Sequence, residues 1–160
     1  MSTDSTAPAT PTRTDYGRIV VGVDGSDASK DALRWAHRQA TFTGSELVAV
    51  GVWSYVTMSY PTMSGYVPTV NDIDLEGDTR ALLEQVVKEV LDGAPVRLVV
   101  TEGHPAEVLT RFSESADLVV LGCRGHGGFV GALVGSVSQH VVSHASCPVV
   151  VVRHPKEPHR

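Results

Sequence analysis

The chain has 160 residues, 42% of them hydrophobic, and a formal net charge of −5 at pH 7. This length and apolar content suit one domain with a core of its own. The acidic balance argues against nucleic acid or an anionic membrane surface as the main partner, and no segment is long and apolar enough to span a bilayer. Two cysteines are too few for a disulfide framework. We therefore expect a cytoplasmic protein that binds neither nucleic acid nor membrane.

The two ends of the chain differ in composition from the rest. The first 15 residues are rich in Ser, Thr, Ala and Pro, with neither a basic start nor a hydrophobic run. They predict a disordered tail and no signal peptide. The polar segment 155–160 predicts a second tail, so the expected domain spans residues 16–154.

Apolar runs rich in β-branched residues alternate with segments of helical period along this domain. The runs predict strands at 18–24, 46–53, 95–101, 117–121 and 148–152. The periodic segments predict helices at 28–40, 72–91, 106–115 and 136–145. Such apolar strands alternating with helices are typical of a parallel sheet covered on both faces. The sequence therefore predicts a single-domain α/β fold.

Local signals mark the ends of several helices. Ser26 is the expected N-cap of the first helix, and Gly44 is its expected C-terminal stop. Gly93 is expected to close the second helix, and Pro105 suits the first turn of the third. Residues 54–70 lack a helical period and predict a long loop.

The two cysteines lie in different surroundings. Cys147 precedes Pro148 at the start of the last apolar run, which predicts a buried and unreactive thiol. Cys123 lies in a glycine-rich segment, where we expect either an exposed thiol or a small side chain that fills the loop.

His140 and His144 are four residues apart in an expected helix and share a face. This spacing can hold a metal ion, but the sequence names no third ligand. Two histidines on the exposed side of a helix is the simpler interpretation.

A glycine-rich segment joins the fourth expected strand to the fourth expected helix. Gly122, Gly125 and Gly135 let the backbone approach an anion closely, and the helix that begins near Ser136 adds unpaired N–H groups and a positive dipole end. The segment has neither the lysine of a P-loop nor the third glycine of the dinucleotide fingerprint. It predicts a site for phosphates, and the alternative is a surface loop without a ligand.

Asp24 comes at the end of the first expected strand. A carboxylate in this place can accept hydrogen bonds from ribose hydroxyls, as acidic residues do in other nucleotide-binding folds. The alternative is a local role in the turn formed by Asp24, Gly25 and Ser26.

The spacing Gly-x2-Gly-x9-Gly-Ser resembles the nucleotide-binding signature of the universal stress protein family. Segments 19–26, 102–106 and 147–152 resemble other parts of the family pattern, in the family's order, and the resemblance covers about residues 16–154. It implies an open, parallel, five-stranded sheet of order 3-2-1-4-5 with helices on both faces. In that order Asp24 and Gly122 would meet at the crevice beyond the carboxyl ends of strands 1 and 4.

The resemblance also implies an ATP site. Asp24 would contact the ribose, Val23, Val50 and Gly103 would lie near the adenine, and Ser138 would lie near the terminal phosphate. Arg124 and His126 would add charge toward the phosphates or face solvent. The full set of expected site residues is Val23, Asp24, Val50, Gly103, Gly122, Arg124, Gly125, His126, Gly135, Ser136, Val137 and Ser138. A side chain at Gly122 or Gly125 is expected to block the phosphates and leave the fold intact. A divalent cation, Mg²⁺ or Mn²⁺, could bridge the phosphates, although no carboxylate cluster stands out to hold it.

The function implied is that of an ATP-binding regulatory module in stress response, with slow ATP hydrolysis within the family's range. No acid–base or nucleophilic pair stands out, so binding is expected rather than turnover. The alternatives are a nucleotide-hydrolysing or adenylyl-transfer enzyme on a similar fold and a nucleotide-free dimeric scaffold. We also expect a homodimer through the edge strand from Pro148 to Val152, with a two-fold axis near Val150, so that proline at Val150 would favour the monomer.

Overall fold

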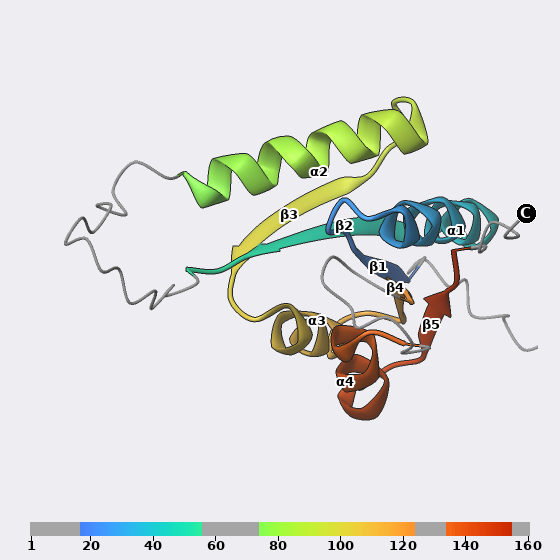
Figure 1. Ribbon diagram of the computed structural model, residues 1–160. Helices are drawn as coiled ribbons and strands as arrows, with labels where there is room; N and C mark the ends of the chain where they lie inside the picture. The colour runs from blue at the N-terminus through green and yellow to red at the C-terminus, as the bar shows by residue number, and fades with distance from the viewer. Residues whose placement is uncertain (1–16, 56–73, 124–133, 155–160) are drawn as a thin grey trace, which may run out of the picture.

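The computed structural model describes residues 17–55, 74–123 and 134–154. The expected tails, most of the loop expected at 54–70, and Arg124, Gly125 and His126 lie outside these residues. The sheet is parallel and has the order β3-β2-β1-β4-β5 (Figure 1). Its strands are β1 Arg18–Gly22, β2 Glu46–Trp53, β3 Arg97–Glu102, β4 Leu118–Gly122 and β5 Val149–Val152.

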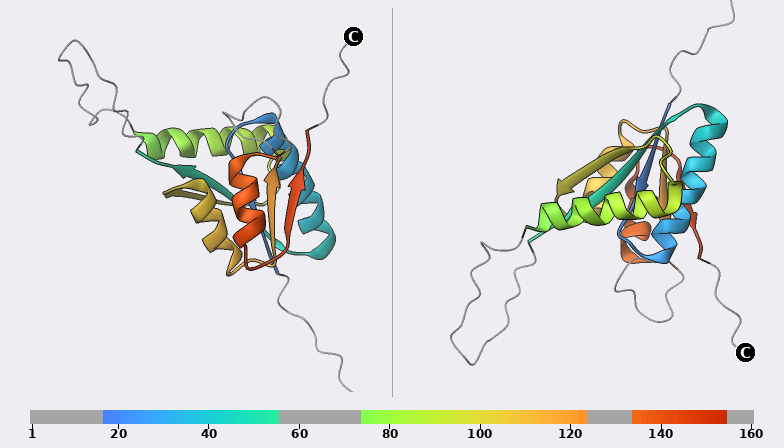
Figure 2. Two further views of the ribbon diagram at one scale, coloured as in Figure 1. Left: turned by 60° about the horizontal axis from the view of Figure 1, so that its bottom comes forward. Right: turned by 90° about the horizontal axis from the view of Figure 1, so that it is seen from above.

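Helices cover both faces of this sheet (Figure 2). They are α1 Asp27–Thr43, α2 Leu75–Leu91, α3 Pro105–Ser113 and α4 Ser136–His144. Helices α1 and α2 pack on one face, where an ion pair joins Lys30 to Glu89 at 2.9 Å. Helices α3 and α4 pack side by side on the other. The expected fold class and strand order are confirmed.

Strand β1 lies at the centre of the sheet and separates two apolar layers. Val20 pairs with Val48 of β2 and Val119 of β4, and it faces α3 and α4. The next residue, Val21, faces α1 and α2. Both valines have 0% of their surface exposed. A strand buried on both faces has no polar alternation, which explains the continuous apolar run in the sequence.

The expected capping residues of α1 are confirmed, although the helix runs three residues further at its carboxyl end than expected. The Ser26 hydroxyl accepts a hydrogen bond from the Ser29 N–H at 3.2 Å and caps the first turn. Gly44 ends the helix with φ 69°, a left-handed conformation that glycine adopts without steric cost.

The start and the C-cap of α2 differ from the expectation. The helix begins at Leu75, because the Asp74 carboxylate accepts the Gly77 N–H at 2.8 Å and acts as the N-cap. Its last residue is Leu91, as expected, but the C-cap is Asp92, which has φ 44°, and Gly93 is only the residue after the cap. Aspartate tolerates the left-handed region better than most residues do, so the glycine was not required as the cap itself.

The expected burial of the Cys147 thiol was wrong, because Cys147 is partly exposed. Cys123 is 8% exposed, which agrees with the alternative of a small side chain that fills the loop. Burial raises the pKa of the Cys147 thiol, so this thiol stays protonated at neutral pH. Within the described ranges, no helix has the length and apolarity needed to cross a bilayer.

The amino ends of three strands are joined by charge. The Glu46 carboxylate lies 2.9 Å from Arg18 Nε and 3.5 Å from a guanidinium nitrogen of Arg97. The hydrogen bond from Arg18 lowers the pKa of Glu46, and the charge of Arg97 adds to this effect. The pKa is thus lower in the folded chain than in the unfolded chain. The contribution of Glu46 to stability is therefore present above its unfolded pKa and lost as the pH falls through its folded pKa.

Replacing Glu46 by Gln should lower the free energy of unfolding by about 0.2–1 kcal/mol at neutral pH, the usual range for exposed ion pairs. The difference from the wild type should vanish in acid, where the wild-type carboxyl is also uncharged. Urea unfolding at several pH values measures this, with Glu84→Gln on the exposed face of α2 as the control. A deficit that persists unchanged in acid would contradict an electrostatic role for Glu46.

Candidate functional site

The candidate site lies at the carboxyl edge of the sheet, where β1 and β4 end side by side. Val21 of β1 pairs with Val120 of β4, and the two strands are parallel. The chain after β1 and the chain after β4 therefore leave the sheet at the same place. This brings the segment that begins at Asp24 next to the segment that begins at Cys123, as the family resemblance implied.

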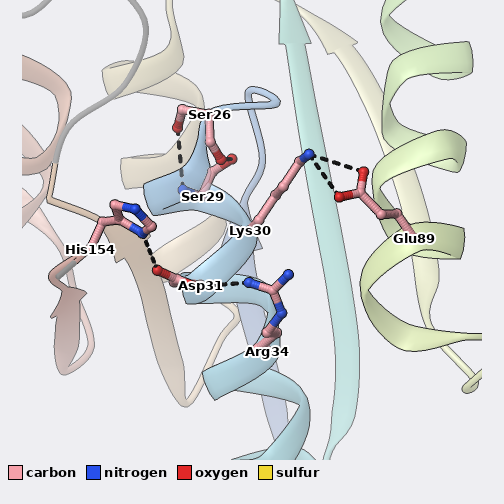
Figure 3. Close-up of polar contacts among 7 residues, drawn as sticks. All are labelled: Ser26, Ser29, Lys30, Asp31, Arg34, Glu89 and His154. Atoms are coloured by element: carbon pink, nitrogen blue, oxygen red, sulfur yellow. Dashed lines mark hydrogen bonds and ion pairs between the residues drawn. The ribbon is translucent and has the colours of Figure 1, made fainter. Parts of the chain in front are cut away.

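Asp24 is exposed and takes part in a turn. Its Oδ1 accepts the Ser26 N–H at 3.0 Å and the Ser26 hydroxyl at 2.6 Å, and its own N–H points to the Ser29 hydroxyl at 3.4 Å (Figure 3 shows both serines). These bonds hold the carboxylate in one orientation at the sheet edge. A carboxylate has several acceptor positions, so the turn is compatible with a contact to a sugar.

Ser29 is the residue of this turn that sequence reasoning missed. It is 4% exposed, and its hydroxyl donates to the Ser26 carbonyl at 2.9 Å. Its position three residues after the N-cap was the available signal. A serine there more often faces solvent, and only the packing of α1 on the sheet shows that it is buried.

Gly122 allows α1 and β4 to approach each other closely. A Cβ at Gly122 would lie 2.6 Å from the Ala28 carbonyl carbon and 2.8 Å from the Ser29 N. Both atoms belong to the helix backbone, which cannot move aside as a flexible side chain can. The expectation that a side chain at Gly122 leaves the fold intact is therefore wrong, because this glycine has a packing role.

The two ends of the glycine-rich segment are tied together. The Gly135 N–H donates to the Cys123 carbonyl at 2.6 Å, and Gly135 is the N-cap of α4 without a capping side-chain bond. Ser136 and Val137 form the first turn of α4, with Ser136 exposed and Val137 packed against the core. The segment thus leaves β4 and returns to the start of α4 at one point of the sheet edge.

Ser138 fixes the first turn of α4 to the end of β4. It is 4% exposed, and its hydroxyl donates to the Gly122 carbonyl at 2.8 Å. Because the hydroxyl proton is used in this bond, the groups of the turn that could bind an anion are its backbone N–H groups.

Val23, Val50 and Gly103, which were expected near the adenine, lie at the same edge of the sheet. The Val23 N–H donates to the Val50 carbonyl at 2.9 Å, and the two side chains are buried in opposite core layers. Gly103 has φ 146°, and its N–H donates to the Trp53 carbonyl at 2.9 Å. A side chain at Gly103 would be strained, so this glycine shapes the turn from β3 into α3.

The electrostatics of the described site come from backbone groups rather than from clustered charges. Among the described residues, no three His, Cys, Asp or Glu side chains gather where they could hold a metal ion. The Mg²⁺ or Mn²⁺ expected beside the phosphates therefore finds no protein carboxylate cluster in this part of the chain.

Comparison with known proteins decides the family. The model of the universal stress protein family matches residues 15–153. The chain belongs to the universal stress protein family. A universal stress protein of Mycobacterium tuberculosis is 39% identical over 143 residues, which cover 84% of this chain and 44% of that protein. One of Mycolicibacterium smegmatis is 37% identical over 145 residues, which cover 87% of this chain and 48% of that protein. The chain thus spans about half the length of these curated relatives.

Solved structures of the family share the fold. A universal stress protein in complex with cAMP has a TM-score of 0.65 and 23% identity, with 88% of this chain and 98% of that chain covered. One from Archaeoglobus fulgidus in complex with dAMP has a TM-score of 0.59 and 23% identity, with 86% of this chain and 98% of that chain covered.

Replacing Gly122 by Ala should lower the free energy of unfolding by about 1–3 kcal/mol, the usual cost of an overpacked core. The added Cβ would collide with the backbone of α1 and push the helix away from β4. Urea unfolding measures the loss. Gly51→Ala is the matched control, because its Cβ would meet side-chain atoms and no backbone, the Thr79 methyl at 3.0 Å and Leu83 Cδ2 at 3.5 Å. Equal, small losses in both variants would show that α1 does not depend on Gly122.

Proposed function

We propose that this universal stress protein domain binds an adenine nucleotide, ATP in particular, and acts as a regulatory binding module. The observation that carries the proposal is the start of α4. The helix begins at Ser136 after the N-cap Gly135, without a side-chain cap, beside the carboxyl end of β4 and next to the segment that holds Asp24. An uncapped helix start at a strand-order reversal is a favourable place for phosphates.

The phosphates would lie against the first turn of α4. The N–H groups of Ser136, Val137 and Ser138 belong to the first turn of a helix, where the N–H groups have no carbonyl of their own helix to bind. Together with the positive end of the helix dipole, they can stabilise negative charge without a lysine. Arg124, Gly125 and His126 would complete the phosphate contacts from the glycine-rich segment.

The nucleoside would extend from the phosphates across β1 toward β2. Asp24 stands at the end of β1, where its carboxylate can accept hydrogen bonds from the ribose hydroxyls. Beyond it, the backbone of Val23 and Val50 and the turn at Gly103 form the floor for the adenine. A Mg²⁺ or Mn²⁺ ion would be held mainly by the phosphates themselves, with water as the other ligand.

The solved relatives support this choice of ligand. Two proteins with the same fold carry cAMP and dAMP, so the fold accommodates an adenine base, a sugar and a phosphate. The proposal takes ATP as the ligand here because the glycine spacing of this chain resembles that of the ATP-binding signature.

Calorimetry with ATP and 2′,3′-dideoxy-ATP tests the proposal through Asp24. Asp24→Asn keeps an oxygen that can accept from the Ser26 N–H and so preserves the turn, but it loses the carboxylate. The affinity for ATP should fall roughly ten- to hundredfold, since a hydrogen bond to a charged group contributes about 1.5–3 kcal/mol. The affinity for the dideoxy analogue, which has no ribose hydroxyls, should change little.

Two outcomes would contradict the proposal. Wild-type protein freed of bound nucleotide that takes up neither ligand would exclude the nucleotide site and favour a scaffold. Equal losses for the two ligands in a folded Asp24→Asn protein would show that Asp24 acts through the turn instead of through the sugar.

We further propose a homodimer formed through β5. In the described sheet β5 is an edge strand, and its four valines are all partly exposed. The opposite edge strand, β3, carries Arg97 and Glu102, and such charges discourage strand pairing. The chain after β5 is held to α1 by a 2.5 Å contact between His154 and Asp31 (Figure 3), which keeps the edge in place. A second copy of the same strand is the simplest partner.

The direction of the backbone N–H groups of β5 decides at which residue a proline would disturb the dimer and not the sheet. The Val119 N–H donates to the Pro148 carbonyl and the Cys123 N–H to the Val152 carbonyl, so alternate residues of β5 face β4. Val150 lies two residues from both Pro148 and Val152, so its N–H and C=O groups also point toward β4. The N–H and C=O groups of Val151 point to the open edge. Proline at Val150 would break the sheet itself, and the expected test there was misplaced.

Val151→Pro should remove an outward N–H donor and shift the protein from dimer to monomer while the sheet persists. Light scattering at micromolar concentration measures the mass, and far-ultraviolet circular dichroism reports on the fold. A wild-type monomer, or a folded Val151→Pro protein that stays fully dimeric, would exclude this interface.

A further inference from the structure

We propose that His140 and His144 on α4 form a surface site for one transition-metal ion that prefers imidazole, such as Zn²⁺ or Ni²⁺. The site is separate from the proposed nucleotide site, which lies at the other end of the same helix. It requires no nucleotide. Three features of the described structure lead to it: the arrangement of the two rings, the hydrogen bond of one of them, and their place on the helix.

The rings of His140 and His144 lie side by side. Both histidines are exposed, and their rings stack with centroids 4.2 Å apart and planes 21° from parallel. Two nitrogens that bind one metal ion at about 2.1 Å lie about 3.0–3.4 Å from each other. A metal ion lies in the plane of each imidazole that binds it, so one of the two rings would have to turn out of the stack, and both side chains are exposed.

The hydrogen bond of His144 selects the nitrogen that would bind the metal. The Nδ1 of His144 lies 2.8 Å from the His140 carbonyl oxygen. A carbonyl can only accept, so Nδ1 carries the proton and the neutral ring has its lone pair on Nε2. Metal-binding histidines typically donate their other ring N–H to a carbonyl or carboxylate in this way, which fixes the ring and makes the ligand nitrogen more basic.

The position on the helix favours a cation. His144 is the last residue of α4, where the unpaired carbonyl groups create the negative end of the helix dipole. The helix contains no lysine or arginine that would repel a metal ion. The histidines thus offer two imidazole nitrogens in a negative local field.

The ligand set defines the class of metal. Imidazole suits Zn²⁺, Ni²⁺ and Cu²⁺, whereas Mg²⁺ and Ca²⁺ require oxygen ligands. In the part of the chain that the structure describes, no third His, Cys, Asp or Glu joins the pair, so water would fill the other positions. The expected site is therefore open and reversible, unlike a closed structural zinc site.

Calorimetry of the full chain, freed of metal and nucleotide, with ZnCl₂ as the probe tests the proposal. The wild type should show a site that MgCl₂ does not occupy. His140→Ala and His144→Ala should each lower the affinity for Zn²⁺ by about tenfold or more, because a chelate becomes a single imidazole. His37→Ala, which removes a histidine of α1, should leave the affinity unchanged.

A double variant separates the geometry from the number of histidines. His144→Ala combined with Val142→His keeps two imidazoles on α4 but places them two residues apart, on different faces of the helix. Val142 is 55% exposed, so the change does not disturb the core. Its affinity should match that of His144→Ala alone. Wild-type affinity in this double variant, unchanged affinity in both single variants, or no Zn²⁺ binding by the wild type would overturn the proposal.

Discussion

The close approach of α1 to β4 is the constraint on which the carboxyl edge of this sheet depends. There is no room for a Cβ between Gly122 and the backbone of Ala28. Ser29, at the start of this helix, contacts the turn at Asp24, and the Ser138 hydroxyl of α4 donates to the Gly122 carbonyl. Gly122 thus lies against the starts of two helices.

Different kinds of interaction hold the residues at the two ends of the sheet. At the amino end, side-chain charges of Arg18, Glu46 and Arg97 join three neighbouring strands. At the carboxyl end, backbone N–H groups and short hydroxyl contacts predominate in the described residues. The charged side chains at the amino end are paired with one another. The N–H groups at a helix start have no partner in their own helix, so they are suited to bind an anion from outside the protein. The carboxyl end is therefore the end at which we place the candidate site.

Most of the fold could be predicted because burial on both faces of a parallel sheet leaves apolar runs in the sequence. The strand order came from the resemblance to a family and not from the residues. Features that depend on contacts between distant segments could not be predicted. The burial of Cys123, the cap at Asp92 and the packing role of Gly122 are of this kind, because each depends on which neighbour lies within a few ångströms. The site was predicted as a set of residues, and its internal bonds were not.

The backbone of Cys123 is hydrogen-bonded both to strand β5 and to the residue that precedes α4. Its N–H is the last rung of the ladder with β5, donating to the Val152 carbonyl, and its own carbonyl receives the Gly135 N–H. With both backbone groups engaged, this residue is a fixed junction between the sheet and the glycine-rich segment. Adding or removing a residue at this junction would shift the register of the ladder and the start of α4. A change in chain length at Cys123 or at Gly135 is therefore expected to disturb both the sheet and α4.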